Sequence, residues 1–252
     1  MLAVIFLFFG NAYGQGSNGS TSKKWAIGIG AGAVKPCVTD NSFSSLMYTG
    51  TGWSLNALAM YQGKRFIHEL QLSISEASLS AGNTAYKNTL SHRYLAIDYL
   101  HLYRLPKKQD KKISVGLGGA LNVLYSDKLY SEFVNRNSSY EFVPALAAAA
   151  RMEYRFSDDP SAVSVKETLV LPLVSAVAYP GYREGNKFSI SSMRLEGFAS
   201  YFRVRNSLVL EKPLTSAQRI SLAYSWDYYQ LTKKTTIRQV VHRLSANYTY
   251  LF

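Results

Sequence analysis

The sequence predicts an all-β fold: a closed, antiparallel, up-and-down transmembrane β-barrel of about ten strands, with eight or twelve strands as the alternatives. Apolar residues recur at every second position in segments of roughly ten to sixteen residues, which is the period of a strand with one apolar face. After the N-terminal region, no stretch approaches the about 18 apolar residues that a transmembrane helix requires. The last segment, Gln239–Phe252 (QVVHRLSANYTYLF), alternates almost without a break and ends on an aromatic residue.

Ten segments carry this alternation, separated by polar turn residues. In chain order they are Trp25–Val34, Gly52–Tyr61, Phe66–Ser75, Leu95–Arg104, Ile113–Tyr125, Leu146–Phe156, Val163–Val177, Leu195–Lys212, Ile220–Tyr228 and Gln239–Phe252. We interpret Leu195–Lys212 as one long strand, because its apolar phase continues across Arg203–Ser207. Dividing it would give an odd number of strands, whereas a single-chain barrel with both termini on one side of the membrane needs an even number.

The predicted connections alternate in length, as the connections of membrane barrels do. Short turns are expected at Gln62–Lys64, Leu105–Lys112, Ser157–Ser161 and Pro213–Ala217. Longer loops are expected at Lys35–Gly50, Ser80–Thr89, Ser126–Tyr140 and Tyr179–Ser192, with a shorter one at Lys233–Thr236. We expect the short turns to lie on the same side of the membrane as both chain termini.

The aromatic residues favour a membrane barrel over a soluble, lipocalin-like barrel, which the alternation alone does not exclude. They gather toward strand ends, where amphipathic rings occupy the headgroup level of a bilayer. The predicted interface girdle consists of Tyr99, Tyr103, Tyr224, Trp226, Tyr228, Tyr248, Tyr250 and Phe252. Glu167 interrupts the apolar face, and we expect it near the strand start at the interface or displaced by a bulge.

The N-terminal region predicts export. Residues 1–14 have the pattern of a secretory signal peptide, with the apolar run Leu2–Phe9 followed by the small-residue site Ala12–Gly14. Residues 15–24 form a short polar segment, and residues 25–252 form the barrel domain. The chain has one cysteine, Cys37, so no disulfide framework is expected. The net charge of +12 suits lipid phosphates or a barrel lumen, and because an exported chain does not meet nucleic acid, no nucleic-acid partner is expected.

The whole predicted barrel, and above all the C-terminal strand with apolar residues at every second position before Phe252, resembles small outer-membrane β-barrel proteins of Gram-negative bacteria. The likeness is one of architecture, of the kind seen in OmpA, OmpW and OmpT. It implies a location in the cell outer membrane and outer-membrane lipids as partners. It also implies that the C-terminal strand is bound by the barrel-assembly machinery.

The interior is the first place to look for function. An interior charge network is predicted to contain Arg151, Glu153, Arg155, Arg203, Arg205, Glu211, Asp98 and Glu69. Other charged residues assigned inward are Arg65, Arg93, Arg104, Lys166, Arg219, Arg243 and Asp227. Because about ten strands enclose a bore that side chains can fill, the first hypothesis is a structural or binding module acting through its external loops. The alternative is a narrow pore whose basic lining favours anions.

An enzymatic site is not favoured. His92 and Asp227 are the candidate catalytic residues, because both are predicted to point inward near the rim that carries the long loops. Such a pair would resemble the site of ten-stranded outer-membrane proteases, although the accompanying acidic residues are missing, so a rim hydrolase is the second alternative. His242 and Ser245 fall on opposite strand faces and cannot share a proton. The sequence has no metal-ligand spacing or nucleotide-binding fingerprint, so neither a metal nor a cofactor is expected.

Overall fold

The computed structural model describes residues 25–41, 44–82, 88–106, 112–131, 138–159, 161–178, 193–232 and 236–252. The predicted signal peptide and the polar segment at residues 15–24 lie outside these ranges. The strands are β1 (Trp25–Asp40), β2 (Ser44–Gln62), β3 (Phe66–Ala81), β4 (Thr89–Arg104), β5 (Ile113–Tyr130), β6 (Ser138–Arg155), β7 (Ser164–Ala178), β8 (Met193–Glu196), β9 (Tyr201–Pro213), β10 (Gln218–Leu231) and β11 (Ile237–Leu251). Within these ranges, no helix is long and apolar enough to cross a membrane.

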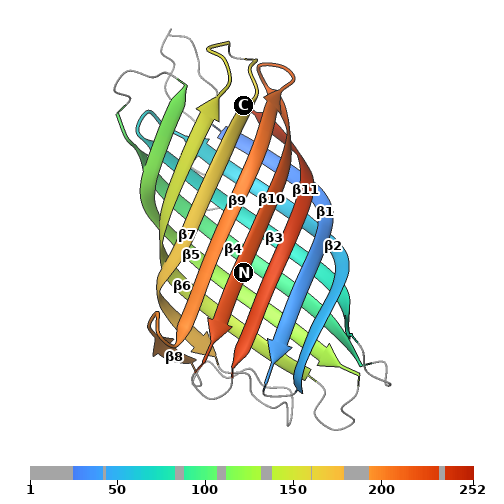
Figure 1. Cartoon of the computed structure of the whole chain (residues 1–252). Coiled ribbons are helices and arrows are strands. Elements are labelled where there is room, and N and C mark those ends of the chain that lie inside the picture. The colour runs from blue at the N-terminus through green and yellow to red at the C-terminus, as the bar shows by residue number, and fades with distance from the viewer. Residues whose placement is uncertain are drawn as a thin grey trace.

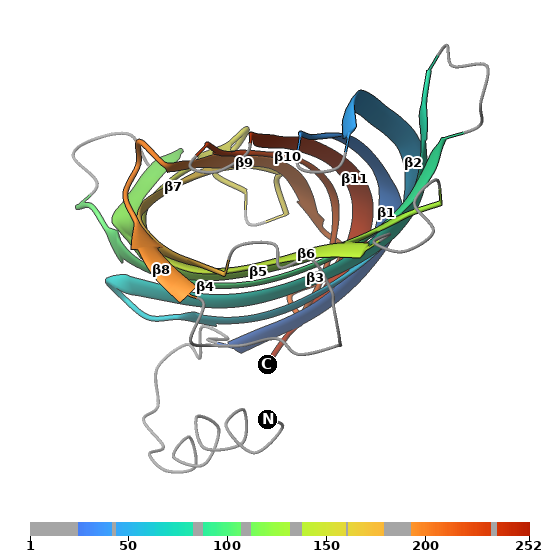
Figure 2. The same ribbon diagram turned by 90° about the horizontal axis from the view of Figure 1, so that it is seen from below.

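The strands form one closed antiparallel barrel, and this confirms the predicted fold class (Figures 1 and 2). Strands that follow one another in the chain pair with each other, except β8 and β9. The ring closes where β1 pairs with β11, from Ala26 opposite Leu251 to Asp40 opposite Ile237. The short strand β8 and the strand β9 both pair with β7, so together they occupy one position in the ring. The barrel therefore has the ten strand positions that the sequence predicts.

The predicted continuous strand Leu195–Lys212 is interrupted, which corrects one detail of the sequence analysis. A turn follows β8, in which the backbone N–H groups of Ser200 and Tyr201 donate to the carbonyl of Gly197. The outward phase also shifts by one residue across the interruption: Leu195 is exposed and Glu196 buried in β8, whereas Leu208 is outward and Tyr201 buried in β9.

The barrel has two different ends (Figure 1). We call the end at which β1 begins and β11 finishes the terminus end, at the top of Figure 1, and the opposite end the loop end. Strands β1 to β6 contain 16 to 19 residues each, more than the about 9–11 needed to cross a bilayer. The wall is therefore tall enough to extend beyond a membrane.

Two of the predicted long loops are wrong for this reason. Every described residue of the predicted loop Lys35–Gly50 except Asn41 belongs to β1 or β2, and every described residue of the predicted loop Ser126–Tyr140 except Ser131 belongs to β5 or β6. Polar residues in these segments mask the alternation, but Val38 and Tyr48 in the first are fully buried inside the bore. Burial of these inward side chains explains why the strands continue.

The outer wall is apolar where a bilayer would contact it. Large apolar side chains stand outward along all the long strands, among them Ile29 at 66% exposure and Leu173 at 60%. Glu167, the predicted exception, is also outward, near the start of β7, and its carboxylate accepts a hydrogen bond from Asn206 Nδ2 at 2.9 Å. On the outer face nearer the loop end, Arg93 of β4 stands between Glu76 and Asp127 on the adjacent strands.

At Gly118, the backbone of β5 lies too close to the backbone of β4 to leave room for a side chain. A Cβ atom on Gly118 of β5 would collide with the backbone carbonyl of His101 on β4. Two residues earlier on the same strand face, a Cβ atom on Gly116 would make ordinary contacts, the nearest at 3.5 Å from Leu102 Cβ. Adding a side chain should therefore destabilise the barrel at Gly118 and have little effect at Gly116.

Candidate functional site in the barrel interior

The loop half of the bore is filled by a packed cluster of side chains, which we call the plug. Large buried rings come from opposite parts of the wall, and each is at most 2% exposed: Tyr48, Tyr94, Tyr130, Tyr201 and Tyr229. They pack with buried aliphatic residues from nearly every strand, including Val38, Leu90 and Ile237. Because the large side chains meet across the bore, this half resembles a protein core more than a channel.

One ionic cluster within the plug is centred on Lys128 and Glu141. The Lys128 ammonium contacts the Glu141 carboxylate and lies 3.7 Å from Asp40 Oδ2, and all three side chains are at most 2% exposed. The Tyr130 hydroxyl donates to Asp40 at 3.3 Å. The Tyr229 hydroxyl contacts the same Glu141 carboxylate. Paired charges of this kind can be buried because each charged group meets a partner.

The sequence analysis did not identify Asp40, Lys128 and Glu141, because they fall in or beside segments that it predicts as loops. A signal was present nonetheless. The inward phase of Asn122 and Leu124 continues at every second residue through Lys128, so extending the period-two pattern would have placed Lys128 in the bore.

A second ionic cluster joins Arg203 to Asp227. Arg203 Nε donates to Asp227 Oδ1 at 2.9 Å and Nη2 donates to Oδ2 at 2.6 Å, so the pair is bidentate. The Tyr94 hydroxyl donates to the same carboxylate and accepts from Arg203 Nη2 at 3.1 Å. Both charged side chains are at most 2% exposed, so this pair is buried within the plug.

The two candidate catalytic residues have different partners. His92 is 2% exposed, and its Nε2 lies 3.0 Å from Ser126 Oγ. The carboxylate of Asp227 is occupied by Arg203 and Tyr94. Both residues point inward as predicted, but they lie within the plug and not at an open rim. This geometry does not favour a hydrolytic pair.

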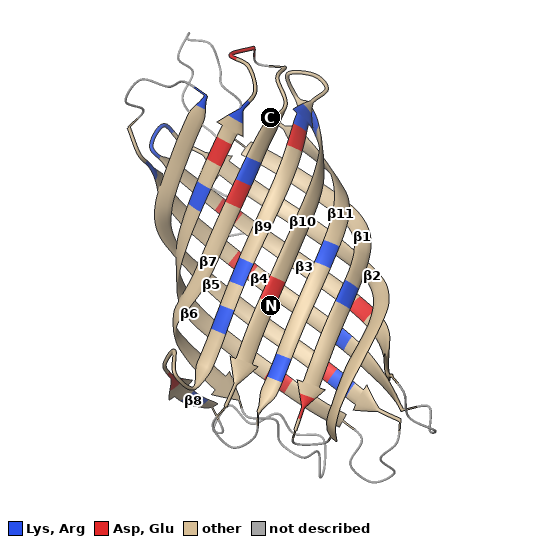
Figure 3. Ribbon diagram, in the orientation of Figure 1, with Lys and Arg blue, Asp and Glu red and all other residues tan. Residues whose placement is uncertain are grey.

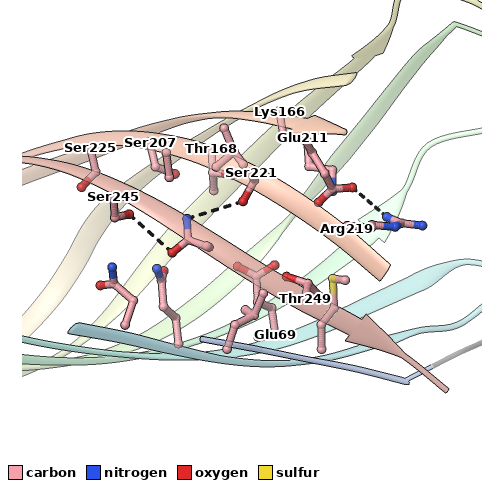
Figure 4. Close-up of a pocket in the computed structure, with 18 of the residues that line it drawn as sticks. Glu69, Lys166, Thr168, Ser207, Glu211, Arg219, Ser221, Ser225, Ser245 and Thr249 are labelled. Carbon is pink, nitrogen blue, oxygen red and sulfur yellow. Dashed lines mark hydrogen bonds and ion pairs between the residues drawn. The ribbon is translucent and has the colours of Figure 1, made fainter. Parts of the chain in front are cut away.

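The terminus half of the bore contains a polar cavity of about 130 Å³ (Figure 4). Three ion pairs stand on its wall. Glu69 receives Arg151 through two hydrogen bonds, of 2.7 and 2.9 Å. Glu211 receives both Lys166 and Arg219, each at 2.7 Å (Figure 4). The cavity lining extends to Gln62 and Leu251 at the strand ends, so it reaches the mouth at the terminus end.

The remaining members of the predicted charge network also face the bore. Arg205 contacts Asp98, and Asp98 also receives Asn122. Arg155 donates to Glu153 at 3.2 Å near the mouth, where the Arg155 side chain is half exposed. Basic and acidic positions lie close together along the neighbouring strands β7 and β9 (Figure 3).

Two basic residues assigned to the bore by the sequence analysis lie elsewhere. Arg93 faces outward with a side chain that is 67% exposed, and its Nε lies 3.3 Å from Glu76 Oε1. It shares the phase of Leu95 and Ile97, so its charge alone suggested an inward direction. Arg65 is exposed in the short turn between β2 and β3 and lines a second hollow of about 450 Å³ at the terminus mouth.

The predicted girdle residues lie on the outer wall. Tyr99 and Tyr103 stand near the terminus end with His68 and His101, and the Tyr99 hydroxyl is 2.8 Å from His68 Nδ1. On β10 the Tyr224 hydroxyl is 2.8 Å from Nδ1 of His242. The other predicted members, Trp226, Tyr228, Tyr248, Tyr250 and Phe252, share the outward phase of Tyr224 or of the last strand.

The charged residues described here form no metal site: among the described residues, no group of three or more His, Cys, Asp or Glu side chains could hold a metal ion. A closed antiparallel barrel with an apolar outer wall and a charged, largely filled interior is the fold of small outer-membrane β-barrel proteins. Comparison with solved structures agrees with this class.

The outer-membrane protease OmpT from Escherichia coli matches with a TM-score of 0.56 and 7% sequence identity, over 94% of this chain and 99% of that one. The translocator domain of the autotransporter NalP from Neisseria meningitidis matches at 0.42 and 10%, over 100% and 94%. Ail of Yersinia pestis matches at 0.38 and 11%, over 90% and 99%. No protein-family model and no curated protein sequence matches the chain. At these identities the likeness to OmpT shows the fold and nothing finer.

Proposed function

We propose that this chain is an integral outer-membrane β-barrel with a closed bore, which serves as a structural or binding module through its loop end. The observation that carries the proposal is the plug. Five tyrosines and two buried ionic clusters fill the loop half of the bore, where a channel would need an aqueous path. A pore is therefore the less favoured function.

The outer wall supports the proposed orientation. Exposed apolar side chains cover most of the outer wall, and Glu76, Arg93 and Asp127 lie side by side on the outer face nearer the loop end. Charged side chains on an outer wall are tolerated outside the hydrocarbon layer and are costly at its centre. The loop end would therefore project from the cell surface, and the terminus end would face the periplasm.

Topology can be tested with single cysteines in a Cys37→Ser background. Asn41→Cys places the thiol in the exposed turn after β1 at the loop end, and Ser157→Cys places it in the exposed turn after β6 at the terminus end. A bulky membrane-impermeant maleimide should label Asn41→Cys on intact cells and Ser157→Cys after the outer membrane is permeabilised. The reverse pattern, or recovery of both variants in the soluble periplasmic extract, would contradict the proposal.

The closed bore can be tested by planar-bilayer conductance of the purified full chain. We expect no stable conductance steps, with a known porin reconstituted in parallel to show that the bilayers report channels. Regular anion-selective steps from the wild-type chain would favour a narrow pore instead. OmpT is a protease by its name. In this chain His92 and Asp227 are buried and contact different residues, Ser126 and Arg203, so we do not propose a hydrolase.

A further inference from the structure

The polar cavity ends against a buried arginine for which the described part of the chain supplies no ion-pair partner. Arg243 of β11 lines the cavity and is 7% exposed. Its Nε and Nη2 atoms are buried and meet no hydrogen-bond acceptor within the described part of the chain. The guanidinium carbon lies 4.4 Å from the centroid of the Tyr94 ring, so one face of the group rests on the plug. A buried cation held in this way is costly unless a partner satisfies it.

The neighbouring carboxylates are already engaged. Five basic and three acidic side chains line the cavity. Glu69 and Glu211 are bound by Arg151, Lys166 and Arg219, as described above. Asp227, at the adjacent level of the plug, is held by Arg203. Among the described residues, no carboxylate lies within ion-pair distance of Arg243, so the cavity holds an excess of positive charge beside it.

Small hydroxyl residues surround this cation. Ser225 of β10 lies directly opposite Arg243, and Ser207 of β9 lies directly opposite Ser225. Ser245 is the next inward residue of β11, and all three serines line the cavity (Figure 4). These small side chains line the cavity beside Arg243, and their hydroxyl groups can donate hydrogen bonds to an anion.

We infer that this cavity is a dead-end binding site for a small oxyanion, either a carboxylate or a phosphate, held by Arg243. The planar guanidinium presents paired donors that match the two oxygens of such a group. The volume of about 130 Å³ admits a small anion with water, whereas sites for drug-sized ligands occupy about 300–1,000 Å³. The ligand would enter from the terminus end, because the plug closes the other side of Arg243.

Binding can be measured by calorimetric titration of the folded full chain in a neutral detergent. Sodium acetate and inorganic phosphate are the two probes, with sodium chloride at matched ionic strength as the reference. We expect saturable binding of at least one oxyanion, and the probe that binds more tightly distinguishes a carboxylate from a phosphate ligand. Absence of saturable binding for both probes would overturn the inference.

Ser225→Asp gives the most direct test, because it places a carboxylate directly opposite Arg243 and supplies the missing counter-charge from within the protein. We expect a folded barrel whose oxyanion affinity falls about 10- to 100-fold, the value of a charge-assisted hydrogen bond. Arg243→Gln should lose affinity to a similar extent, and Arg93→Gln, which removes the same charge from the outer wall, should bind as wild type does. Unchanged affinity in Ser225→Asp would overturn the inference even if Arg243→Gln fails to fold.

Discussion

The buried Arg203–Asp227 pair offers the sharpest quantitative test of how the plug is held together. Replacing Asp227 with Leu leaves the Arg203 guanidinium, 2% exposed, without its bidentate partner. Removing one member of a buried pair costs about 3–5 kcal/mol, because the other charge stays buried and uncompensated. Arg203→Met should destabilise the barrel by a similar amount, because Asp227 then keeps only the Tyr94 hydroxyl as a partner within the plug. The double variant replaces both charges with apolar groups of similar volume, and it should be more stable than either single variant.

The assay is a double-mutant cycle on the free energy of unfolding, measured by urea titration in lipid vesicles with tryptophan fluorescence. We expect a coupling energy of at least about 3 kcal/mol between the two positions. The exposed outer pair Arg93–Glu76 is the matched control, and replacing it with Met and Leu should give a coupling of about 0–1 kcal/mol. If the Arg203 and Asp227 single effects add to within about 0.5 kcal/mol of the double variant, the plug does not depend on this pair.

Three further changes test the wall. Gly118→Ala should lower the free energy of unfolding by about 1–3 kcal/mol because its Cβ meets the His101 carbonyl, while Gly116→Ala, measured in the same urea titration, should be nearly neutral; equal effects would contradict the close approach. Leu222→Arg, on the apolar outer wall, should cost about 2–4 kcal/mol for folding into vesicles, and a neutral result would argue against lipid contact there. Deletion of Phe252 should reduce the amount of heat-modifiable, folded protein in the outer membrane, and a wild-type yield would show that assembly does not need the terminal aromatic.

Much of the outer wall could be predicted from the sequence. Leu222 and Tyr224 are outward and Asp98 is inward because side chains of a strand alternate, and alternation is a local property of the chain. The assignment of a side chain to the bore was wrong where it followed the charge of the residue and not its position in the alternating pattern. Arg93 was assigned to the bore for its charge, although it shares the outward phase of Leu95.

The contacts inside the bore could not be predicted in the same way. Arg205 meets Asp98 across 107 residues of sequence, and Arg151 meets Glu69 across 82. The number of strands, their tilt and the flattening of the ring decide which strands face each other across the bore. The local sequence pattern of a single strand does not specify any of these properties. The sequence could therefore name most of the inward charges without pairing them.

The sequence by itself determined a ten-stranded barrel with an apolar outer wall, because alternation with a period of two places apolar and polar side chains on opposite faces of every strand. Only the tertiary structure decided that the loop half of the bore is packed shut and that Arg243, beside the polar cavity, has no ion-pair partner among the described residues. The reason is physical: the wall is set by each residue and its neighbours along the strand, whereas the interior is set by which side chains meet across the closed ring.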